Sequence, residues 1–415
     1  MKNDPKRFIS DEYTELFRDE ADFTKEVCEI EDQGRWFTAG TPDLGIKAVE
    51  RGDNRSLPMD IQKTLDALAP GIDVDAALDT IQNGSQLFLE SADGLIPIRT
   101  VSISDLMESA VGIRSAFLGS DIEKDPGFFG AVFDAAKTRL NRQKRMNKLW
   151  VCAGKLTACG TNEYLVMRMD KVFEQIIPEL RNRFGDLEFV EGVTSHPVVR
   201  AIYRVSGKTE SAGLWNEYQQ MVKQMGVKDT LLHDPRRITF DVTIQTSNTK
   251  NSAATCRAVV EIEDARVPVG TPISVAHRGN KDGVAALAAR IPELFAKFGE
   301  KESSVARLMG HMLNHPADAV INMGKRLGIQ MPLLTKAAEE LSDTLDMRGE
   351  DRCTAWDAYV FLCRTINIAA GDYSPAEICK IEEACARALR RNWRDEDHEI
   401  KKTLITESAP APAIL

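Results

Sequence analysis

One short stretch of the chain, residues 238–244, limits the fold more than any other feature of the sequence. It reads Ile-Thr-Phe-Asp-Val-Thr-Ile, so apolar and polar side chains alternate without error. Successive side chains of a strand point to opposite faces of a sheet, and the alternation therefore predicts a half-buried strand whose polar face, with Asp241, meets solvent. Similar patterns predict further strands at 164–168, 198–205 and 254–263, with helices near 170–183 and 212–225 between them.

The last third of the sequence has a helical periodicity instead. From Gly283 onwards apolar residues recur every three or four positions, as one face of a packed helix requires. Ser374-Pro375-Ala376-Glu377 has the pattern of a capping box, with Ser at the N-cap and Glu at the third helical position. After the helix that begins at Gly283, the further predicted helices are 302–313, 317–327, 332–346, 354–369 and 375–392.

These two patterns together predict an α+β fold, in which a central antiparallel or mixed sheet domain is followed by an all-helical C-terminal region. The part before residue 127 shows shorter elements. They are a helical arm over 1–34, short helices at 59–68 and 74–83, and a hairpin that pairs 86–90 with 95–101 across Asp93-Gly94.

The 415 residues are enough for two or three domains, and we predict four regions. They are an acidic N-terminal region with short helices and a hairpin (1–126), an α+β domain with a basic helix and a strand-rich core (127–282), a helical domain (283–402), and a disordered tail (403–415).

Charge is distributed unevenly along the chain. Residues 1–136 hold 13 Lys and Arg against 27 Asp and Glu, so they carry a net charge of −14 and the remainder carries +4. The strongest local signal is 137–155, which has seven basic residues and no acid. Phe129, Phe133 and Leu140 form an apolar stripe just before and within this run. The pattern predicts one helix over 127–150 that buries one face and presents a basic face opposite.

Such a cluster fits the phosphates of nucleic acid, because Lys and Arg neutralise them and release counterions. Trp150 is a candidate for stacking on unpaired bases, together with Tyr164. The alternative interpretation is a solvated helix face, or a partner for the acidic first third of the same fold. The candidate phosphate-binding residues are Lys137, Arg139, Arg142, Lys144, Arg145, Lys148 and Lys155.

A second basic run surrounds Trp393 near the predicted end of the last helix, where the helix dipole favours cations in any case. It consists of Arg387, Arg390, Arg391 and Arg394.

The sequence gives little support for a phosphate-binding loop, a metal or cofactor site, or a metal-dependent nuclease. Ser206-Gly207-Lys208-Thr209 follows a predicted strand, but Ile202 stands where a phosphate-binding loop needs its first glycine. None of the eight cysteines forms a C-x-x-C pair, and the six histidines supply no close ligand pairs, so we expect no metal site and no cofactor. The carboxylates considered for metal-dependent nuclease chemistry are Asp241, Glu261, Glu263 and Asp264. Asp241 occupies the exposed face of an alternating strand, and no lysine stands two residues after Glu261 or Glu263, so we expect no such site.

The order of the middle segments resembles a family found in phages and plasmids, known as domain of unknown function 932. The resemblance covers about 160–370. Where the family has an Asn-Ser-His-Asp-Gly-like turn this chain has residues 247–251, Ser-Asn-Thr-Lys-Asn, and its Cys-x-Asn is here Cys256-Arg257-Ala258. The segments that carry the likeness are 164–170, 187–190, 201–205, 246–248, 255–259, 277–279 and 354–359. The resemblance implies an origin in a mobile element and brings no catalytic residues.

The sequence therefore predicts a nucleic-acid-binding protein of phage or plasmid DNA metabolism, one that binds single strands in annealing or recombination. A self-assembling virion or assembly protein is the first alternative, and an enzyme with an unrecognised site is the second. Single-stranded DNA and further copies of the chain are the expected partners. No secretory signal and no run of 18 apolar residues is visible, so the expected location is the cytoplasm of a bacterial host, without a membrane partner.

Overall fold

A computed structural model of the chain describes residues 13–50, 85–92, 94–113, 126–140, 145–226, 238–249, 253–262, 265–277, 282–296, 298–300 and 302–400. The predicted helices at 59–68 and 74–83 and the predicted tail at 403–415 lie outside these ranges. The fold is α+β, as the sequence patterns predict: an antiparallel sheet in the middle of the chain is followed by packed helices. Among the described residues, none of the helices is long and apolar enough to cross a membrane.

The largest sheet has seven strands in the order β1-β8-β9-β10-β11-β12, with β13 also paired to β11. All of its pairings are antiparallel. The predicted strand at 238–244 lies at its centre as β10. The strands are β1 (Thr14–Phe17), β8 (Leu187–Ser195), β9 (Val199–Val205), β10 (Ile238–Thr246), β11 (Ala254–Ile262), β12 (Ala265–Pro268) and β13 (Ile273–Val275).

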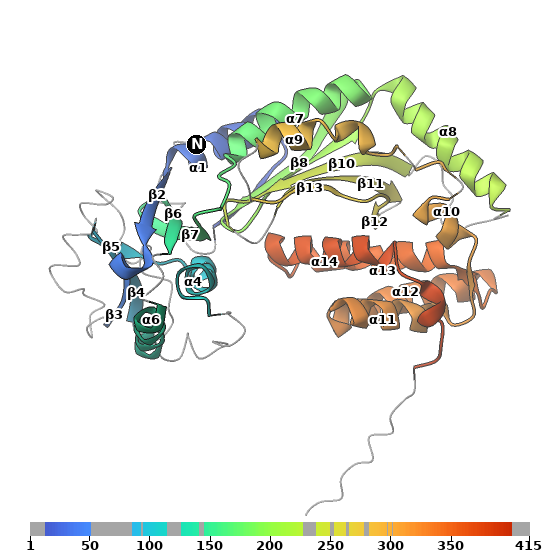
Figure 1. The fold of residues 1–415 in the computed structure, drawn as a ribbon. Coiled ribbons are helices and arrows are strands. Elements are labelled where there is room, and N and C mark those ends of the chain that lie inside the picture. Colours follow the sequence, from blue (N-terminus) through green and yellow to red (C-terminus); the bar gives the residue numbers. More distant parts are fainter. Residues whose placement is uncertain are drawn as a thin grey trace, which may run out of the picture.

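One face of this sheet is apolar and is covered by four helices (Figure 1). Tyr203, Phe240 and Val242 on this face are at most 1 % exposed, because they pack into the same core as Phe173 and Leu180 of α7. Burial of a continuous apolar surface is the main force that holds such layers together. The four helices are α1 (Glu20–Asp32), α7 (Met169–Phe184), α8 (Lys208–Gln224) and α9 (Gly283–Ala288).

The opposite face of the sheet is covered by α13 and α14, with α11 and α12 beyond them (Figure 1). The α13 helix is buried along almost its whole length, and its Tyr359 hydroxyl donates to the carbonyl of Pro268 on β12 at 2.8 Å. The predicted capping box of α14 is present, since Ser374 and Glu377 bond reciprocally. The elements on this side of the sheet are α10 (Ser304–Met309), α11 (Pro316–Leu327), α12 (Met331–Arg348), α13 (Ala355–Ala369), α14 (Pro375–Ala388) and the strand pair β14 (Met312–Leu313) and β15 (Cys353–Thr354).

The remaining elements form a smaller part with its own core, drawn at the left of Figure 1. The predicted hairpin is confirmed as β4 and β5. β2 pairs with β6, so one sheet contains residues from both sides of position 126, where the sequence predicts a boundary between two regions. The elements are β2 (Gly34–Gly40), β6 (Met146–Cys152) and β7 (Lys155–Thr161) in one sheet, β3 (Gly45–Glu50), β4 (Ser85–Ser91) and β5 (Gly94–Pro97) in another, and the helices α4 (Thr100–Leu106) and α6 (Pro126–Leu140).

Three local predictions are corrected by the structure. The helical arm begins at Glu20, where Asp19 caps α1, and the residues just before it form β1. Residues 165–168 form no strand. The helix that begins at Gly283 ends at Ala288, and the chain continues in short 3₁₀ and turn segments up to Phe295, whose φ of 59° lies outside the helical region.

The predicted helix over 127–150 is also wrong in its second half. Phe129 and Phe133 do bury one face of α6, but this helix ends at Leu140 and a strand, β6, begins at Met146. The last four residues of β6, from Leu149 to Cys152, are all buried: this strand pairs on both edges, and a hydrophobic core packs against each of its faces, with Leu149 and Val151 in one and Trp150 and Cys152 in the other. A short apolar run of this kind suits a central strand as well as a helix, and the pairing partner decides between them.

Candidate functional site

The basic residues between 137 and 155 do not share one surface. Lys137 on α6 donates from Nζ to the carbonyl of Leu44 at 2.6 Å. Arg145 is exposed just before β6. Arg142 and Lys144 lie outside the described residues, and Arg139 is placed only by its backbone, in the last turn of α6.

The two remaining cations of the run lie on strands. Lys148 on β6 is half-buried, and its Nζ donates to the carbonyl of Tyr164 at 2.7 Å. Lys155 on β7 is 1 % exposed. The expectation that one amphipathic helix presents all seven cations is therefore wrong, because the chain changes from helix to strand in the middle of the run.

Trp150 is a core residue in this structure. It is 2 % exposed and packs against Trp36, whose ring lies 6.1 Å away at an angle of 21°. Trp36 in turn stacks on Tyr164 at 5.4 Å, and Tyr164 stacks on His277 at 4.9 Å and 5°. The interpretation of Trp150 and Tyr164 as platforms for bases is corrected, because the protein's own rings already occupy their faces.

The second basic run, near the end of α14, differs from the first because its arginines are exposed. Arg387, Arg390, Arg391 and Arg394, which we call the C-terminal arginine cluster, are all exposed. Trp393 between them is 1 % exposed, and its Nε1 donates to the carbonyl of Ala388 at 3.1 Å. The buried indole thus holds the segment against the end of α14 while the arginines point outward.

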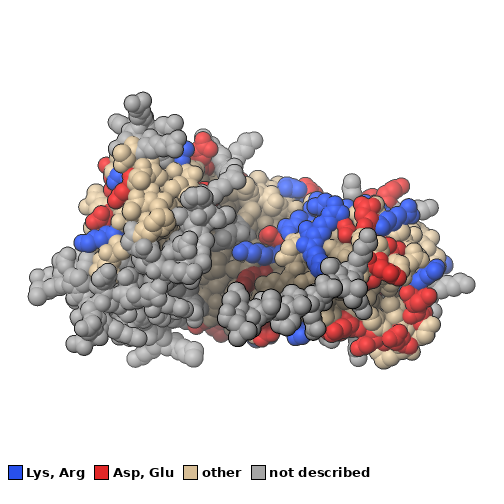
Figure 2. Space-filling view, turned by 90° about the horizontal axis from the view of Figure 1, so that it is seen from below, with Lys and Arg blue, Asp and Glu red and all other residues tan. Residues whose placement is uncertain are grey.

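Within the described part of the chain, no ion pair within 4.0 Å joins a carboxylate to any member of this cluster. Arg394 bonds instead to Nδ1 of His311 at 3.1 Å. Nearby acids are engaged elsewhere, because Asp397 accepts from the backbone of Asn314 and His315, and Glu396 pairs with Arg326. Figure 2 shows Lys and Arg side chains gathered over the part of the molecule that carries the C-terminal helices.

A second charged region lies between the large sheet and α14. The polar side chains of β10 do alternate with apolar ones, but Asp241 is 1 % exposed and not solvent-facing as predicted. Its neighbours on the same face, Arg200 on β9 and Arg257 on β11, are 7 % and 4 % exposed. The prediction failed because α13 and α14 cover this face, which no local pattern in β10 reveals.

Glu382 on α14 joins the two buried arginines. Its carboxylate accepts from Arg200 Nη1 at 2.7 Å and from Arg257 Nη1 at 3.4 Å. Burial by itself raises the pKa of Glu382, but Arg200, Arg266 and Arg257 outweigh it and hold this pKa below its usual value. The helical layer is thus tied to the sheet by charge as well as by apolar contact.

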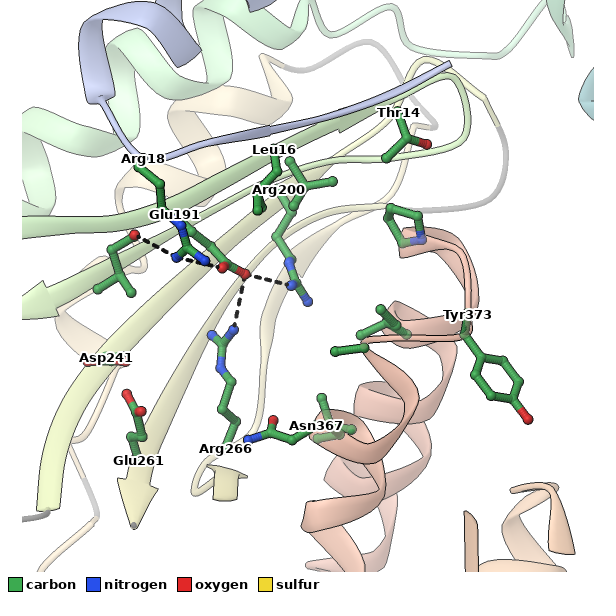
Figure 3. A pocket seen from close by; sticks show the side chains of 16 residues that line it. Thr14, Leu16, Arg18, Glu191, Arg200, Asp241, Glu261, Arg266, Asn367 and Tyr373 are labelled. Atoms are coloured by element: carbon green, nitrogen blue, oxygen red, sulfur yellow. Dashed lines mark hydrogen bonds and ion pairs between the residues drawn. The ribbon is translucent and has the colours of Figure 1, made fainter. Parts of the chain in front are cut away.

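Glu191 on β8 forms the second hub, shown in Figure 3 between three guanidinium groups. Its carboxylate lies 3.1 Å from Arg18, 3.3 Å from Arg200 and 3.9 Å from Arg266. These charged groups border a cavity of about 590 Å³ between the sheet and α13 and α14, which we call the sheet–helix cavity.

Two of the carboxylates considered above for metal chemistry, Asp241 and Glu261, form ion pairs with an arginine. Arg204 on β9 bonds to Asp241 at 3.1 Å and also pairs with Glu261 on β11. Burial raises the pKa of Glu261, and the neighbouring Asp241 raises it further. Among the described residues no group of three or more His, Cys, Asp and Glu is arranged to hold a metal ion, and Glu263 and Asp264 lie outside them.

The cysteines are free thiols, and seven of them are buried. Burial raises the pKa of Cys152 to about 11 and that of Cys256 to about 12. Such thiols are protonated at neutral pH and behave as small apolar residues, so neither is an activated nucleophile.

The sheet–helix cavity is the feature that the sequence patterns missed. Its arginines are spread over positions 18 to 266 of the chain, so no cluster of basic residues marks them in the sequence. The available signal was the run of charged residues at polar positions of consecutive predicted strands, and only the covering helices turn that face into a cavity. Comparison of the chain with protein-family models, with curated proteins and with solved structures finds no match.

Proposed function

We propose that this protein binds single-stranded nucleic acid and that the C-terminal arginine cluster makes the main phosphate contacts. The observation that carries the proposal is the outward exposure of Arg387, Arg390, Arg391 and Arg394 without carboxylate partners among the described residues. An exposed guanidinium offers two parallel donors to a phosphate, which makes arginine suited to binding a polyanion.

The arrangement of the cluster supports this use. The first three arginines lie at and just beyond the last turn of α14, where the unpaired carbonyl ends of the helix favour positive charge. Trp393 fixes the following turn, so the cations are displayed on a folded surface and lose less conformational freedom when they bind. The net charge of −10 argues for a local contact surface, since the chain as a whole repels a polyanion.

The biological setting proposed is phage or plasmid DNA metabolism, with single-strand binding or annealing during recombination. The resemblance of residues 160–370 to the phage and plasmid family supports this setting. Self-association would place several clusters along one strand and raise the avidity for it.

The test is fluorescence anisotropy of a labelled single-stranded oligonucleotide, titrated with protein at several salt concentrations. Each phosphate contact on a single strand contributes about 0.7 to the slope of log K against log salt. The triple variant R387A/R390A/R391A removes three exposed cations, so the slope should fall by about 2.

The matched control is R183A/K208A/K223A, which removes three exposed cations from α7 and α8, on the other side of the sheet. Its slope and affinity should stay close to those of the wild type. Equal losses in both triple variants would indicate diffuse charge attraction and would contradict the proposal. Light scattering on the same samples tests the alternative of an assembly protein, which requires large regular particles in the absence of nucleic acid.

A further inference from the structure

Three arginines and three carboxylates line the sheet–helix cavity, and the ion-pair network behind them holds more positive than negative charge. The charged group at this cavity consists of the charged side chains that line it and the described residues joined to them by ion pairs of up to 4.0 Å, either directly or, for Arg257, through the shared partner Glu382. Five arginines then face four carboxylates. The arginines are 18, 200, 204, 257 and 266, and the carboxylates are those of Glu191, Asp241, Glu261 and Glu382.

Of these arginines, Arg266 on β12 is the one whose closest carboxylate lies farthest away. Its side chain is 14 % exposed, and its closest carboxylate contact is the 3.9 Å approach to Glu191. Its other contact is a long hydrogen bond of 3.4 Å from Nη2 to the hydroxyl of Thr243. Arg200 and Arg204, in contrast, each have a carboxylate within 3.1 Å. A guanidinium removed from water normally requires a close partner of this kind.

Two further observations show that the arginines of this region are incompletely paired. Burial lowers the pKa of Arg266, with Glu382 acting against it and Arg200 adding to it, so the surrounding carboxylates do not offset the loss of hydration. Nε of Arg257 is buried and has no hydrogen-bond partner among the described residues. Buried donors of this kind are uncommon in folded proteins.

We propose that the sheet–helix cavity binds a small organic molecule that carries one singly charged oxyanion, and that Arg266 is the residue that receives it. The excess of one positive charge matches a carboxylate or a phosphate diester, whereas Asp241 and Glu261 would repel a doubly charged group. Figure 3 shows Arg266 and Asn367 extending from β12 and α13 into the same space.

The shape and lining of the cavity indicate the rest of the ligand. A volume of about 590 Å³ lies within the range of small-molecule sites, about 300–1,000 Å³, and is too small for a folded partner. Part of the lining is apolar and would cover a hydrocarbon body, as supplied by Leu16, Val193, Ile366, Ala370, Pro375 and Ile378. The oxyanion would lie at the arginine end and the apolar body against α13 and α14.

The experiment is a thermal unfolding titration of the full chain in a low-chloride buffer at pH 7 with three separate probes that each carry one negative charge: dimethyl phosphate, dibutyl phosphate and hexanoate. Ligand that binds only the folded state raises Tm, and at a hundredfold excess over Kd we expect a rise of a few degrees, at least about 2 °C. A rise with hexanoate identifies a carboxylate ligand, and a rise with either phosphate probe identifies a phosphate ligand. If none of the three raises Tm, the proposal is overturned.

Two variants separate this site from general ion effects. R266M keeps most of the length of the side chain and removes the charge, so it should abolish the rise. A370F places a ring in the cavity from an exposed position just after α13 and should abolish it as well. R183M, an exposed arginine on α7, should respond like the wild type. A rise that persists in R266M or A370F contradicts the assignment.

The unliganded variants give a readout that needs no probe. If the role of Arg266 is to bind an anion, R266M should have a Tm equal to or above that of the wild type, since it removes a largely buried charge that is incompletely paired. R204M should lose Tm, because it leaves the buried Asp241 and the half-buried Glu261 side by side without their cation. A clear loss of Tm in R266M would show a structural cation and overturn the proposal. R266M should bind oligonucleotide normally, so this inference and the nucleic-acid proposal can fail separately.

Discussion

The carboxylate of Glu382 on α14 lies 2.7 Å from Nη1 of Arg200 on β9, and neither side chain is more than 8 % exposed. This pair joins two layers that are far apart in the sequence, and a second arginine, Arg257, shares the same carboxylate. A buried pair of this kind contributes modest net stability, but the loss of one member leaves the other charged and without a partner. The pair therefore makes the position of the helical layer sensitive to single substitutions.

For Glu382→Gln we expect a loss of about 3–5 kcal/mol in the free energy of unfolding, because both arginines lose their shared anion. The pKa of Glu382 is lowered by its arginines from an ordinary value of 4.5, so its contribution is present above about pH 4.5 and is lost as the pH falls through the folded-state pKa. Urea unfolding at pH 7 and pH 4 measures both effects. E383Q, a half-buried neighbour on α14, is the control and should change little; a mild E382Q would contradict the assignment.

His277 makes the stability of the aromatic stack depend on pH. Burial lowers its pKa from the ordinary value of 6.5, with the bond to the carbonyl of Leu165 acting against it. The unfolded chain therefore binds a proton more readily, and the stability should fall as the pH drops below about 6.5. H277N should flatten this part of the profile, whereas H398N, at an exposed position, should not. An unchanged slope in H277N between pH 7.5 and pH 5.5 would exclude this role.

Gly192 on β8 lies directly beneath the ring of Phe23 from α1. A Cβ at this position would stand 2.3 Å from Cδ2 of Phe23, which is a severe overlap in a packed core. G192A should therefore cost about 1–3 kcal/mol in the free energy of unfolding. G213A on α8 is a suitable control, since a Cβ there meets no atom within 4 Å, and alanine should stabilise the helix slightly. Chemical denaturation of the pair should give effects of opposite sign.

Trp150 should matter for stability and not for nucleic-acid binding. Its ring is buried against Trp36, and its removal leaves a large void, so W150A should lose about 3–5 kcal/mol and W150F less. Under conditions where W150F is folded, its affinity for a labelled oligonucleotide should equal that of the wild type. A drop in affinity with an unchanged far-UV spectrum would restore Trp150 as a binding residue.

The 137–155 run offers a separate test of where nucleic acid is contacted. If the C-terminal arginine cluster carries the main contacts, R142A/K144A/R145A should reduce the salt slope by less than R387A/R390A/R391A does. Both variants remove three positive charges, so the comparison isolates position from net charge. The opposite order would move the proposed interface to the smaller part of the molecule.

Several features follow from local patterns and could be predicted from the sequence. The strand at 238–244, the hairpin around Asp93-Gly94 and the capping box at Ser374 each depend on side-chain alternation, turn residues or a cap within a few positions. The α+β class follows from the same evidence, because the periodicity changes from two residues in the middle to three or four near Gly283. These signals are short-range, and tertiary contacts did not override them.

Other features were decided only by the tertiary structure. Nothing near Leu149 shows that β2 and β7 flank it on both edges and turn a predicted helix into a buried strand. Nothing in β10 shows that α14 will cover Asp241 and bring Glu382 to Arg200. Alternation in the sequence determined which side chains share a face, whereas packing of segments more than a hundred residues apart decided whether that face meets water or another layer. The physical reason is that burial depends on neighbours distant in the chain, and the energy of a charged side chain depends on burial more than on its own residue type.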